Sequence, residues 1–204
     1  MKTGKLILLC IVVSLLSCTN STITEEVNSD ATSLKEGVAT VIPDGSVFNI
    51  PDHWKTENET SFQFSQLSGR VTVAAMIFTS CQSACPRIMA DIKKIESAFT
   101  ADELKRIRFL LISMDPENDT PQRLKEFSNE YELKENWTLI CSDEDATMEM
   151  ANILGVRVKK LSGGGFDHSN SIFVLSPNGL ICHQQDGLGM DPAETIKAIR
   201  SFHL

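Results

Sequence analysis

One run of eight residues, Val71 to Phe78, restricts the fold more than any other feature of the sequence. It is nearly all apolar, which is typical of a strand buried on both faces of a sheet. After it, apolar residues recur at helical spacing, at Ile88, Ile92, Ile95 and Phe99. Pro86 is expected to open this helix, since a missing N–H costs little in a first turn. With 204 residues and 42% hydrophobic content, the chain is long enough to cover both faces of such a strand.

Further strands and helices alternate along the chain. Strands are predicted at 109–114, 137–141, 171–175 and 180–183, and helices after the caps Thr100, Thr120 and Asp191 and over 145–154. The order β-α-β-α-β-α-β-β-α implies an α/β fold with a mainly parallel central sheet, helices on both faces and a C-terminal antiparallel hairpin. This is a thioredoxin-like topology.

The N-terminus is typical of an export signal. Lys2 and Lys5 precede an apolar run, 6–16, that is too short to span a bilayer comfortably. Residues 15–18 (LLSC) resemble a bacterial lipobox, which implies cleavage before Cys18 and a lipid on that cysteine; an uncleaved membrane anchor is the alternative. We therefore expect a signal peptide at 1–17, a lipidated cysteine and flexible tether at 18–45, and a domain at 46–204. Such a protein would be a lipoprotein of the bacterial cell envelope that faces the periplasm or the exterior.

The charge of the chain argues against one class of partner. The formal net charge is −8, and no cluster of Lys and Arg stands out. We therefore expect no nucleic-acid partner, because the phosphates of nucleic acid require a basic face.

Cys81 and Cys85 lie in the segment 79–86 (TSCQSACP), where the apolar strand meets the helix. We expect both sulfurs to point the same way from the first helical turn. The unpaired N–H groups of a helix N-terminus favour thiolate over thiol, so the pair can form a disulfide or bind a soft metal ion. A purely structural disulfide is the alternative, but such bonds more often join distant segments.

His168 is the third candidate site residue. It follows the glycine run Gly163 to Gly165 in a predicted loop, directly before a strand expected to pair with Val71 to Phe78. The loop could therefore overhang the two cysteines, and the glycines would let its backbone adapt. Two thiolates and one imidazole suit Cu(I), whereas Zn(II) would need a fourth ligand.

Three sequence motifs resemble those of one known family. They are the segments 81–86 (CQSACP) and 115–121 (DPENDTP) and the pair Asp167-His168. In this order and context they are similar to the SCO/SenC proteins, which are thioredoxin-fold copper chaperones for cytochrome c oxidase assembly. Gln82 departs from the pattern, because family members usually carry Pro directly after the first cysteine.

The resemblance implies a site, a cargo and a partner. Cys81, Cys85 and His168 would bind copper as Cu(I), with Cu(II) as the other oxidation state to consider. The partner would be the copper-site subunit of cytochrome c oxidase, or another exported cuproprotein, which would receive copper or have its cysteines reduced. The alternative is a thiol–disulfide oxidoreductase that acts on exported proteins through Cys81 and Cys85. A peroxidase and a pure binding module rank lower.

Several other residues have simpler expected roles. Asp115 and Asp119 are expected in a turn where Asp119 or Thr120 caps the next helix. Cys141 and Cys182 lie on predicted strands and are expected as buried apolar residues, with a disulfide between them left open. Core positions are expected for Met76, Met89, Met148 and Met150.

Overall fold

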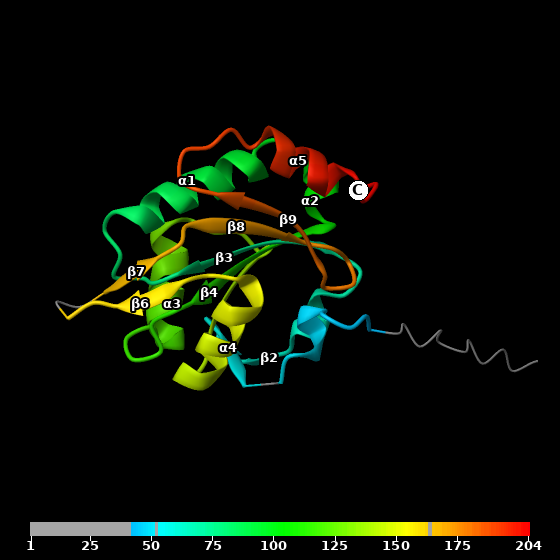
Figure 1. Cartoon of the computed structure of the whole chain (residues 1–204). Coiled ribbons are helices and arrows are strands. Elements are labelled where there is room, and N and C mark those ends of the chain that lie inside the picture. Colours follow the sequence, from blue (N-terminus) through cyan, green and yellow to red (C-terminus); the bar gives the residue numbers. More distant parts are fainter. Residues whose placement is uncertain (1–41, 52, 163–164) are drawn as a thin grey trace, which may run out of the picture. The chain divides into compact units, whose positions relative to one another are not determined.

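The computed structural model describes residues 42–51, 53–162 and 165–204 (Figure 1). The predicted signal peptide, Cys18 and nearly all of the tether lie outside the described residues, as do Gly163 and Gly164. In the described part of the chain, none of the helices has the length and hydrophobicity needed to cross a membrane.

The described residues contain a sheet of seven strands in the order β2-β1-β5-β4-β3-β8-β9. The strands are β1 (Trp54–Thr56), β2 (Ser61–Phe62), β3 (Val71–Ile77), β4 (Ile107–Ser113), β5 (Trp137–Cys141), β8 (Ser171–Leu175) and β9 (Ile181–Asp186). The central strands β3, β4 and β5 run parallel, while β8 and β9 form an antiparallel hairpin beside β3. The predicted parallel centre and C-terminal hairpin are thus confirmed. The antiparallel pair β1–β2 at the other edge of the sheet was not predicted.

Five α-helices and two short 3-10 helices connect the strands in the described residues. They are η1 (Val47–Asn49), η2 (Phe64–Leu67), α1 (Ala84–Glu96), α2 (Ala101–Leu104), α3 (Pro121–Glu130), α4 (Glu144–Leu154) and α5 (Ala193–Arg200). Thr100 and Glu103 form a capping box at α2, and Thr120 caps α3. Helix α1 begins at Ala84, two residues before the predicted start, so Pro86 lies inside its first turn.

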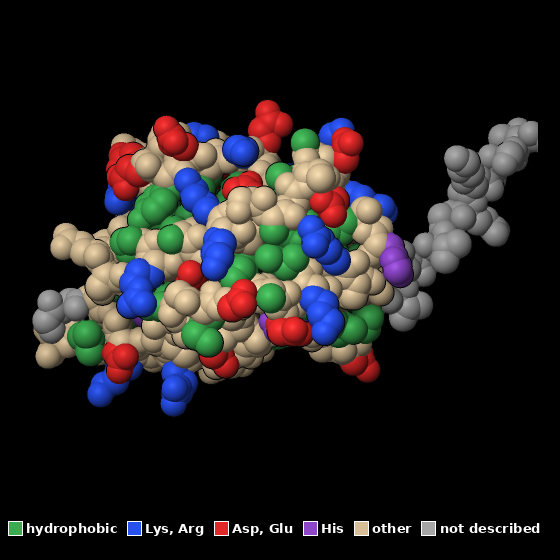
Figure 2. All heavy atoms as spheres, turned by 90° about the horizontal axis from the view of Figure 1, so that it is seen from above, with side chains coloured by type: hydrophobic (Ala, Val, Ile, Leu, Met, Phe, Trp, Pro, Cys, Tyr) green, Lys and Arg blue, Asp and Glu red, His purple; other side chains and the backbone are tan. Residues whose placement is uncertain are grey.

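The helices cover both faces of the sheet, as predicted. In Figure 1, α1 and α5 lie above the sheet and α4 lies below it. Helix α5 contacts the segment that follows α1, because the Arg200 guanidinium donates to the Ala98 carbonyl at 2.8 Å and lies 5.3 Å from the centre of the Phe99 ring. Helix α3 also neighbours α1, since Lys93 donates to the carbonyl of Tyr131 at the α3 C-terminus. On the face formed by α1 and α5, Lys and Arg are interspersed with Asp and Glu (Figure 2).

The core explains why the apolar run at Val71 dominates the fold. Every residue of β3 is buried, and the inner side of α1 buries Ile88, Ile92 and Ile95 against the sheet. Burial of such side chains contributes roughly 1.5–3 kcal/mol each. This packing fixes the C-terminal end of β3, and the segment with the two cysteines begins there.

A second, two-stranded sheet lies outside the main one. It consists of β6 (Val158–Lys160) and β7 (Phe166–His168), which pair antiparallel. The structure therefore corrects the prediction that His168 lies in a loop: it is the last residue of a strand. The glycine run between these two short segments is a turn signal that could have suggested a hairpin here.

Candidate metal centre

The two cysteines meet at the N-terminus of α1. The chain turns after β3, with the Cys81 N–H donating to the Phe78 carbonyl at 3.1 Å. Cys81 precedes the helix rather than lying on its first turn as predicted, whereas Cys85 is the second helical residue. The Cys85 N–H donates to the Cys81 sulfur at 3.3 Å. The N-cap residue Ser83 makes no side-chain capping bond, so the Cys81 sulfur serves as acceptor at this helix end.

The environments of the two thiols are unequal. Burial acts to raise the pKa of Cys81, but the N–H groups of Cys85, Ser83 and Ala84 outweigh it and hold this pKa below its ordinary value. Cys85 is fully buried, and burial raises its pKa to about 12, with the negative charge of Cys81 adding to the effect. The pair thus combines a half-buried sulfur that ionises readily with a buried sulfur that holds its proton.

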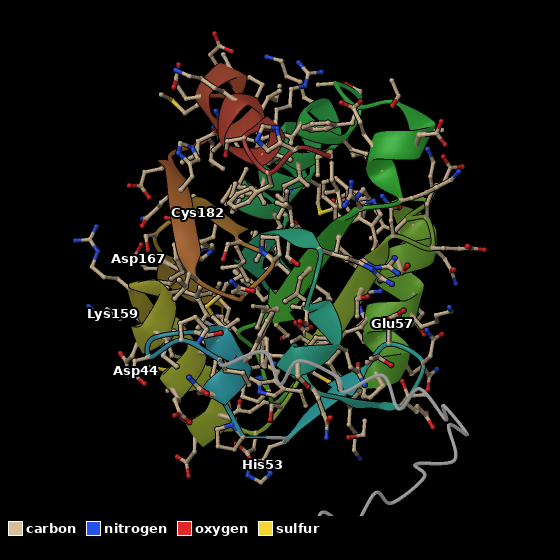
Figure 3. All side chains as sticks on the ribbon, turned by 90° about the vertical axis from the view of Figure 1, so that its right-hand side faces the viewer. Asp44, His53, Glu57, Lys159, Asp167 and Cys182 are labelled. Carbon is tan, nitrogen blue, oxygen red and sulfur yellow. The ribbon has the colours of Figure 1, made fainter. Side chains whose placement is uncertain are left out.

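Phe78 joins the cysteines to His168. Its carbonyl accepts from the Cys85 thiol at 3.5 Å, and its ring contacts two residues of β7 edge-on. The ring centres lie 5.3 Å apart for Phe166 and 5.8 Å apart for His168. Because side chains alternate along a strand, Phe166 and His168 share the inner face of the hairpin, and Asp167 lies on the outer face opposite Lys159 (Figure 3). Sequence reasoning missed Phe78 as part of the site.

The imidazole of His168 has a defined orientation. Its Nδ1 lies 3.0 Å from the Ser169 carbonyl, which can only accept, so Nδ1 carries the hydrogen. The lone pair is then on Nε2, which is the arrangement of a metal-binding histidine whose other nitrogen is held by a carbonyl.

The structure brings Cys81 and Cys85 together and places His168 against the edge of the Phe78 ring system. Among the described residues, no three His, Cys, Asp or Glu side chains stand close enough to hold a metal ion. The three-ligand set therefore stays a prediction, and the structure supplies the two thiols and an oriented imidazole on neighbouring elements.

A buried carboxylate, that of Asp119, holds the start of the cysteine segment through hydrogen bonds to Thr79. Asp119 accepts from the Thr79 hydroxyl at 2.5 Å, from the Thr79 N–H at 3.2 Å and from the Ser113 hydroxyl at 2.6 Å. Thr79 follows β3 and Ser113 ends β4, so this carboxylate ties together the ends of two parallel strands. Arg123 of α3 adds a bond from Nε to the Thr79 hydroxyl at 3.1 Å. The expected capping role belongs to Thr120 alone, and the bonds by which Asp119 links the two strand ends were not predicted.

The other cysteines and methionines lie away from this site or on its edge. Cys141 is buried, as predicted, while Cys182 on β9 is exposed, which corrects its expected burial. Met76, Met89 and Met150 belong to the core, but Met148 of α4 is 40% exposed. It lines a pocket beside the hairpin rather than filling the core.

Comparison with known proteins places this geometry in a family. The SCO1/SenC family profile matches residues 48–203. A SCO1 protein homolog of Bacillus subtilis is 27% identical over 150 residues, which cover 72% of this chain and 77% of the homolog. A structure of BsSco, described as a member of the Sco family of cytochrome c oxidase assembly proteins with a disulfide switch, has a TM-score of 0.66 and 26% identity, covering 76% of this chain and 93% of BsSco.

A copper-bound structure shares the fold as well. Arabidopsis thaliana ScoI with copper bound has a TM-score of 0.63 and 21% identity, covering 74% of this chain and 97% of ScoI. The family match spans nearly all of the described residues, including both cysteines and His168. The chain therefore belongs to the SCO1/SenC family.

Proposed function

We propose that this chain binds Cu(I) through Cys81, Cys85 and His168 and delivers it to the binuclear copper site of cytochrome c oxidase during assembly. The observation that carries the proposal is the unequal thiol pair at the start of α1, with an imidazole on the facing strand. Two sulfurs and one nitrogen form a soft, low-coordinate donor set, which Cu(I) prefers over harder ions. The copper-bound relative and the oxidase-assembly relative are consistent with this cargo and this destination.

Copper binding would proceed in an order set by the two thiols. Cys81 offers the more readily formed thiolate, and Cys85 must release its proton as the metal takes its place. His168 would complete the set through Nε2, which requires the β6–β7 hairpin to bring it nearer to the sulfurs. The partner would then receive the ion by exchanging its own ligands for these three. Only the reduced pair can load, so an internal disulfide would be the unloaded state.

Thiol–disulfide exchange is a second candidate function, favoured by the same asymmetry. The Cys81 thiolate would attack a partner disulfide, forming a mixed disulfide and releasing one partner thiolate. Cys85, after losing its proton, would attack the Cys81 sulfur and release the second partner thiolate. The partner gains two electrons, and the chain ends with a Cys81–Cys85 disulfide. The accessible sulfur has the lowered pKa and the buried one is placed to resolve the intermediate.

A titration of Cu(I) against a competing chelator tests the first function. We expect the reduced full-length chain, purified in detergent, to bind one equivalent of Cu(I), and His168→Ala to weaken binding roughly tenfold or more. His53→Ala is the matched control, since His53 is exposed and labelled at the edge of the molecule in Figure 3. A wild-type chain that fails to bind Cu(I) but reduces a protein disulfide would favour the oxidoreductase.

We also propose that the chain is exported, cleaved before Cys18 and anchored in the cell envelope by lipid on that residue. The support is the sequence of residues 2–18 alone. Cys18→Ser should move the chain from the membrane fraction to the soluble envelope fraction, and intact mass should show the loss of the lipid. A variant that keeps both its lipid mass and its membrane association would contradict the anchor.

A further inference from the structure

A pocket of about 230 Å³ lies beside the candidate metal centre. It is bounded by the segment after β4, by α4 and by the β6–β7 hairpin. Phe166 forms part of its wall, and the same ring packs against Phe78, whose carbonyl accepts from the Cys85 thiol. The pocket is therefore linked to the metal centre by the contact between the Phe166 and Phe78 rings, and its lining residue Val158 pairs directly with His168 across the hairpin.

Five of the residues that line the pocket are apolar, namely Met114, Pro116, Met148, Val158 and Phe166. Met114 and Phe166 contribute side chains at least partly buried in the core, while Met148 is 40% exposed at the mouth. Met is flexible and polarisable and recurs at surfaces that accept apolar side chains. Thr147 also lines the pocket; it is only 2% exposed, and its hydroxyl has no hydrogen-bond partner. A buried, unpartnered hydroxyl costs free energy, which a polar group entering with the occupant would relieve.

The rim of the pocket is acidic and already holds one ammonium group. The Nζ of Lys160 lies 2.6 Å from Glu117 Oε2, and both side chains are more than half exposed. Asp115 and Glu144 add further negative charge around that ammonium. Glu144 makes no ion pair within the described part of the chain, so the rim has unmatched negative charge. This arrangement would attract a Lys or Arg and repel phosphate groups, which excludes nucleic acid and phospholipid headgroups as occupants.

We propose that this pocket docks the copper-accepting protein, taking an apolar side chain that lies beside a Lys or Arg on its surface. The inference rests on the proposed delivery of copper. The apolar side chain would contact Met148 and Phe166, and the neighbouring cation would pair with Glu144 or displace Lys160 from Glu117. Docking here would hold the acceptor ligands next to the Cys81–Cys85 pair while the ion is exchanged, without adding a ligand to the metal.

The test measures association of the full-length chain with the copper-free, soluble copper-site domain of the oxidase subunit from the same organism. Met148→Gln and Glu144→Gln change exposed side chains of α4, so the fold is not at stake. Together they should raise the Kd roughly tenfold, the effect expected for loss of an interface anchor. Ile153→Gln and Glu149→Gln are matched controls on the same helix, because Ile153 is 39% exposed and neither residue lines the pocket.

Salt gives a second readout of the acidic rim. The screening length falls from about 10 Å at 0.1 M salt to about 3 Å at 1 M, so wild-type association should weaken with salt. Glu144→Gln should reduce that dependence, whereas Glu149→Gln should not. The Cu(I) affinity of all four variants should equal that of the wild type, because none changes a proposed ligand.

Three results would overturn the proposal in distinguishable ways. If the wild type transfers copper and the pocket variants bind the domain as tightly as the controls, the pocket is not the docking site, and the proposed function stands. If the wild type neither binds the domain nor transfers copper to it, the proposed delivery fails and the docking inference fails with it. If the chain binds a second equivalent of Cu(I) that Met148→Gln abolishes, the pocket is a metal site instead.

Discussion

Cys81 and Cys85 are four residues apart, yet their chemistry is set by different neighbours. The Cys81 sulfur faces backbone N–H groups, which lower its pKa, while burial raises the pKa of Cys85 to about 12. The thiolate is the nucleophile, so at pH 7–8 iodoacetamide should modify Cys81 much faster than Cys85. The rate at Cys81 should rise with pH, with its midpoint below the ordinary thiol pKa. Peptide mass mapping of the modified full-length chain measures both rates.

Other cysteines of the same chain provide the controls for this prediction. Cys141 is buried with a pKa of about 11, and Cys182 is exposed but has a pKa raised by partial burial. Cys182 therefore tests whether solvent exposure or thiol pKa sets the reaction rate. It should react more slowly than Cys81 although its side chain is more exposed. Equal rates at Cys81 and Cys182 would show that the helix N-terminus does not activate Cys81.

Asp119 is a buried carboxyl whose contribution to the free energy of unfolding depends on pH. Burial raises its pKa above the ordinary value, against the lowering effect of the bonds from Ser113 and Thr79. A carboxyl whose folded pKa exceeds its unfolded pKa contributes stability that is present below the unfolded value and is lost as pH rises through the folded value. Asp119→Asn removes this contribution together with two or more accepted bonds.

We therefore expect Asp119→Asn to lower the free energy of unfolding by about 1–3 kcal/mol near pH 4, and by less near pH 7. Urea unfolding of both chains at the two pH values measures the difference. Asp102→Asn serves as control, since Asp102 is exposed on α2. A loss that is equal at both pH values would mean that the folded pKa of Asp119 is not raised.

At the scale of the elements, two glycines with similar positive φ angles differ in the space around them, so their alanine variants distinguish the cost of backbone strain from the cost of a steric clash. Gly155 caps α4 at φ +67°, with open space where a Cβ would stand. Gly179, in the β8–β9 turn, has a similar φ of +77°, but its Cβ would meet Ser46 and lie 2.8 Å from Phe48. Gly155→Ala should cost about 1–2 kcal/mol, the penalty of a left-handed conformation. Gly179→Ala should cost clearly more in urea unfolding, because the N-terminal segment must shift as well; equal costs would refute this account.

Regular elements were predictable from sequence where pattern and caps agreed. Strands β3 and β5 and helix α4 were placed to within one residue, and α3 begins directly after its predicted cap Thr120, because apolar periodicity and caps point to the same ends. The β6–β7 hairpin was missed because three-residue strands contain too little periodicity to distinguish from loop. As a result, His168 was predicted in a loop, whereas it lies on a strand where its side chain shares one face with Phe166.

At the scale of the whole molecule, strand order decides which distant residues meet. The alternation of strands and helices predicted the parallel centre and the C-terminal hairpin, and thereby the approach of residues 166–168 to the end of β3. It could not predict the Thr79–Ser113–Asp119 network, because such contacts depend on side-chain geometry at two strand ends. Whether Cys141 and Cys182 meet was left open, although the expected pairing of the strand at 171–175 with Val71 to Phe78 already places the hairpin on the side of β3 away from β5.

The strand order of the sheet keeps Cys141 and Cys182 apart. Cys141 lies on β5 and Cys182 on β9, and strands β4, β3 and β8 run between them. At about 4.8 Å per strand spacing, the two residues are roughly 19 Å apart across the sheet. A disulfide needs Cα atoms within about 7 Å, so this pair cannot form without breaking the core.

Mild oxidation of the full-length chain should therefore join Cys81 to Cys85 and leave Cys141 free. Cys182 is exposed and lies on β9, an edge strand of the sheet, where Figure 3 labels it, so further oxidation of the described cysteines should link two chains through it. Proteolysis without reductant followed by mass spectrometry identifies each linked peptide pair, and Cys182→Ser should abolish the dimer while leaving the internal disulfide intact. A peptide pair joining residues 141 and 182 of one chain would contradict the strand order itself, because no rearrangement of side chains alone can bring these sulfurs together across three strands.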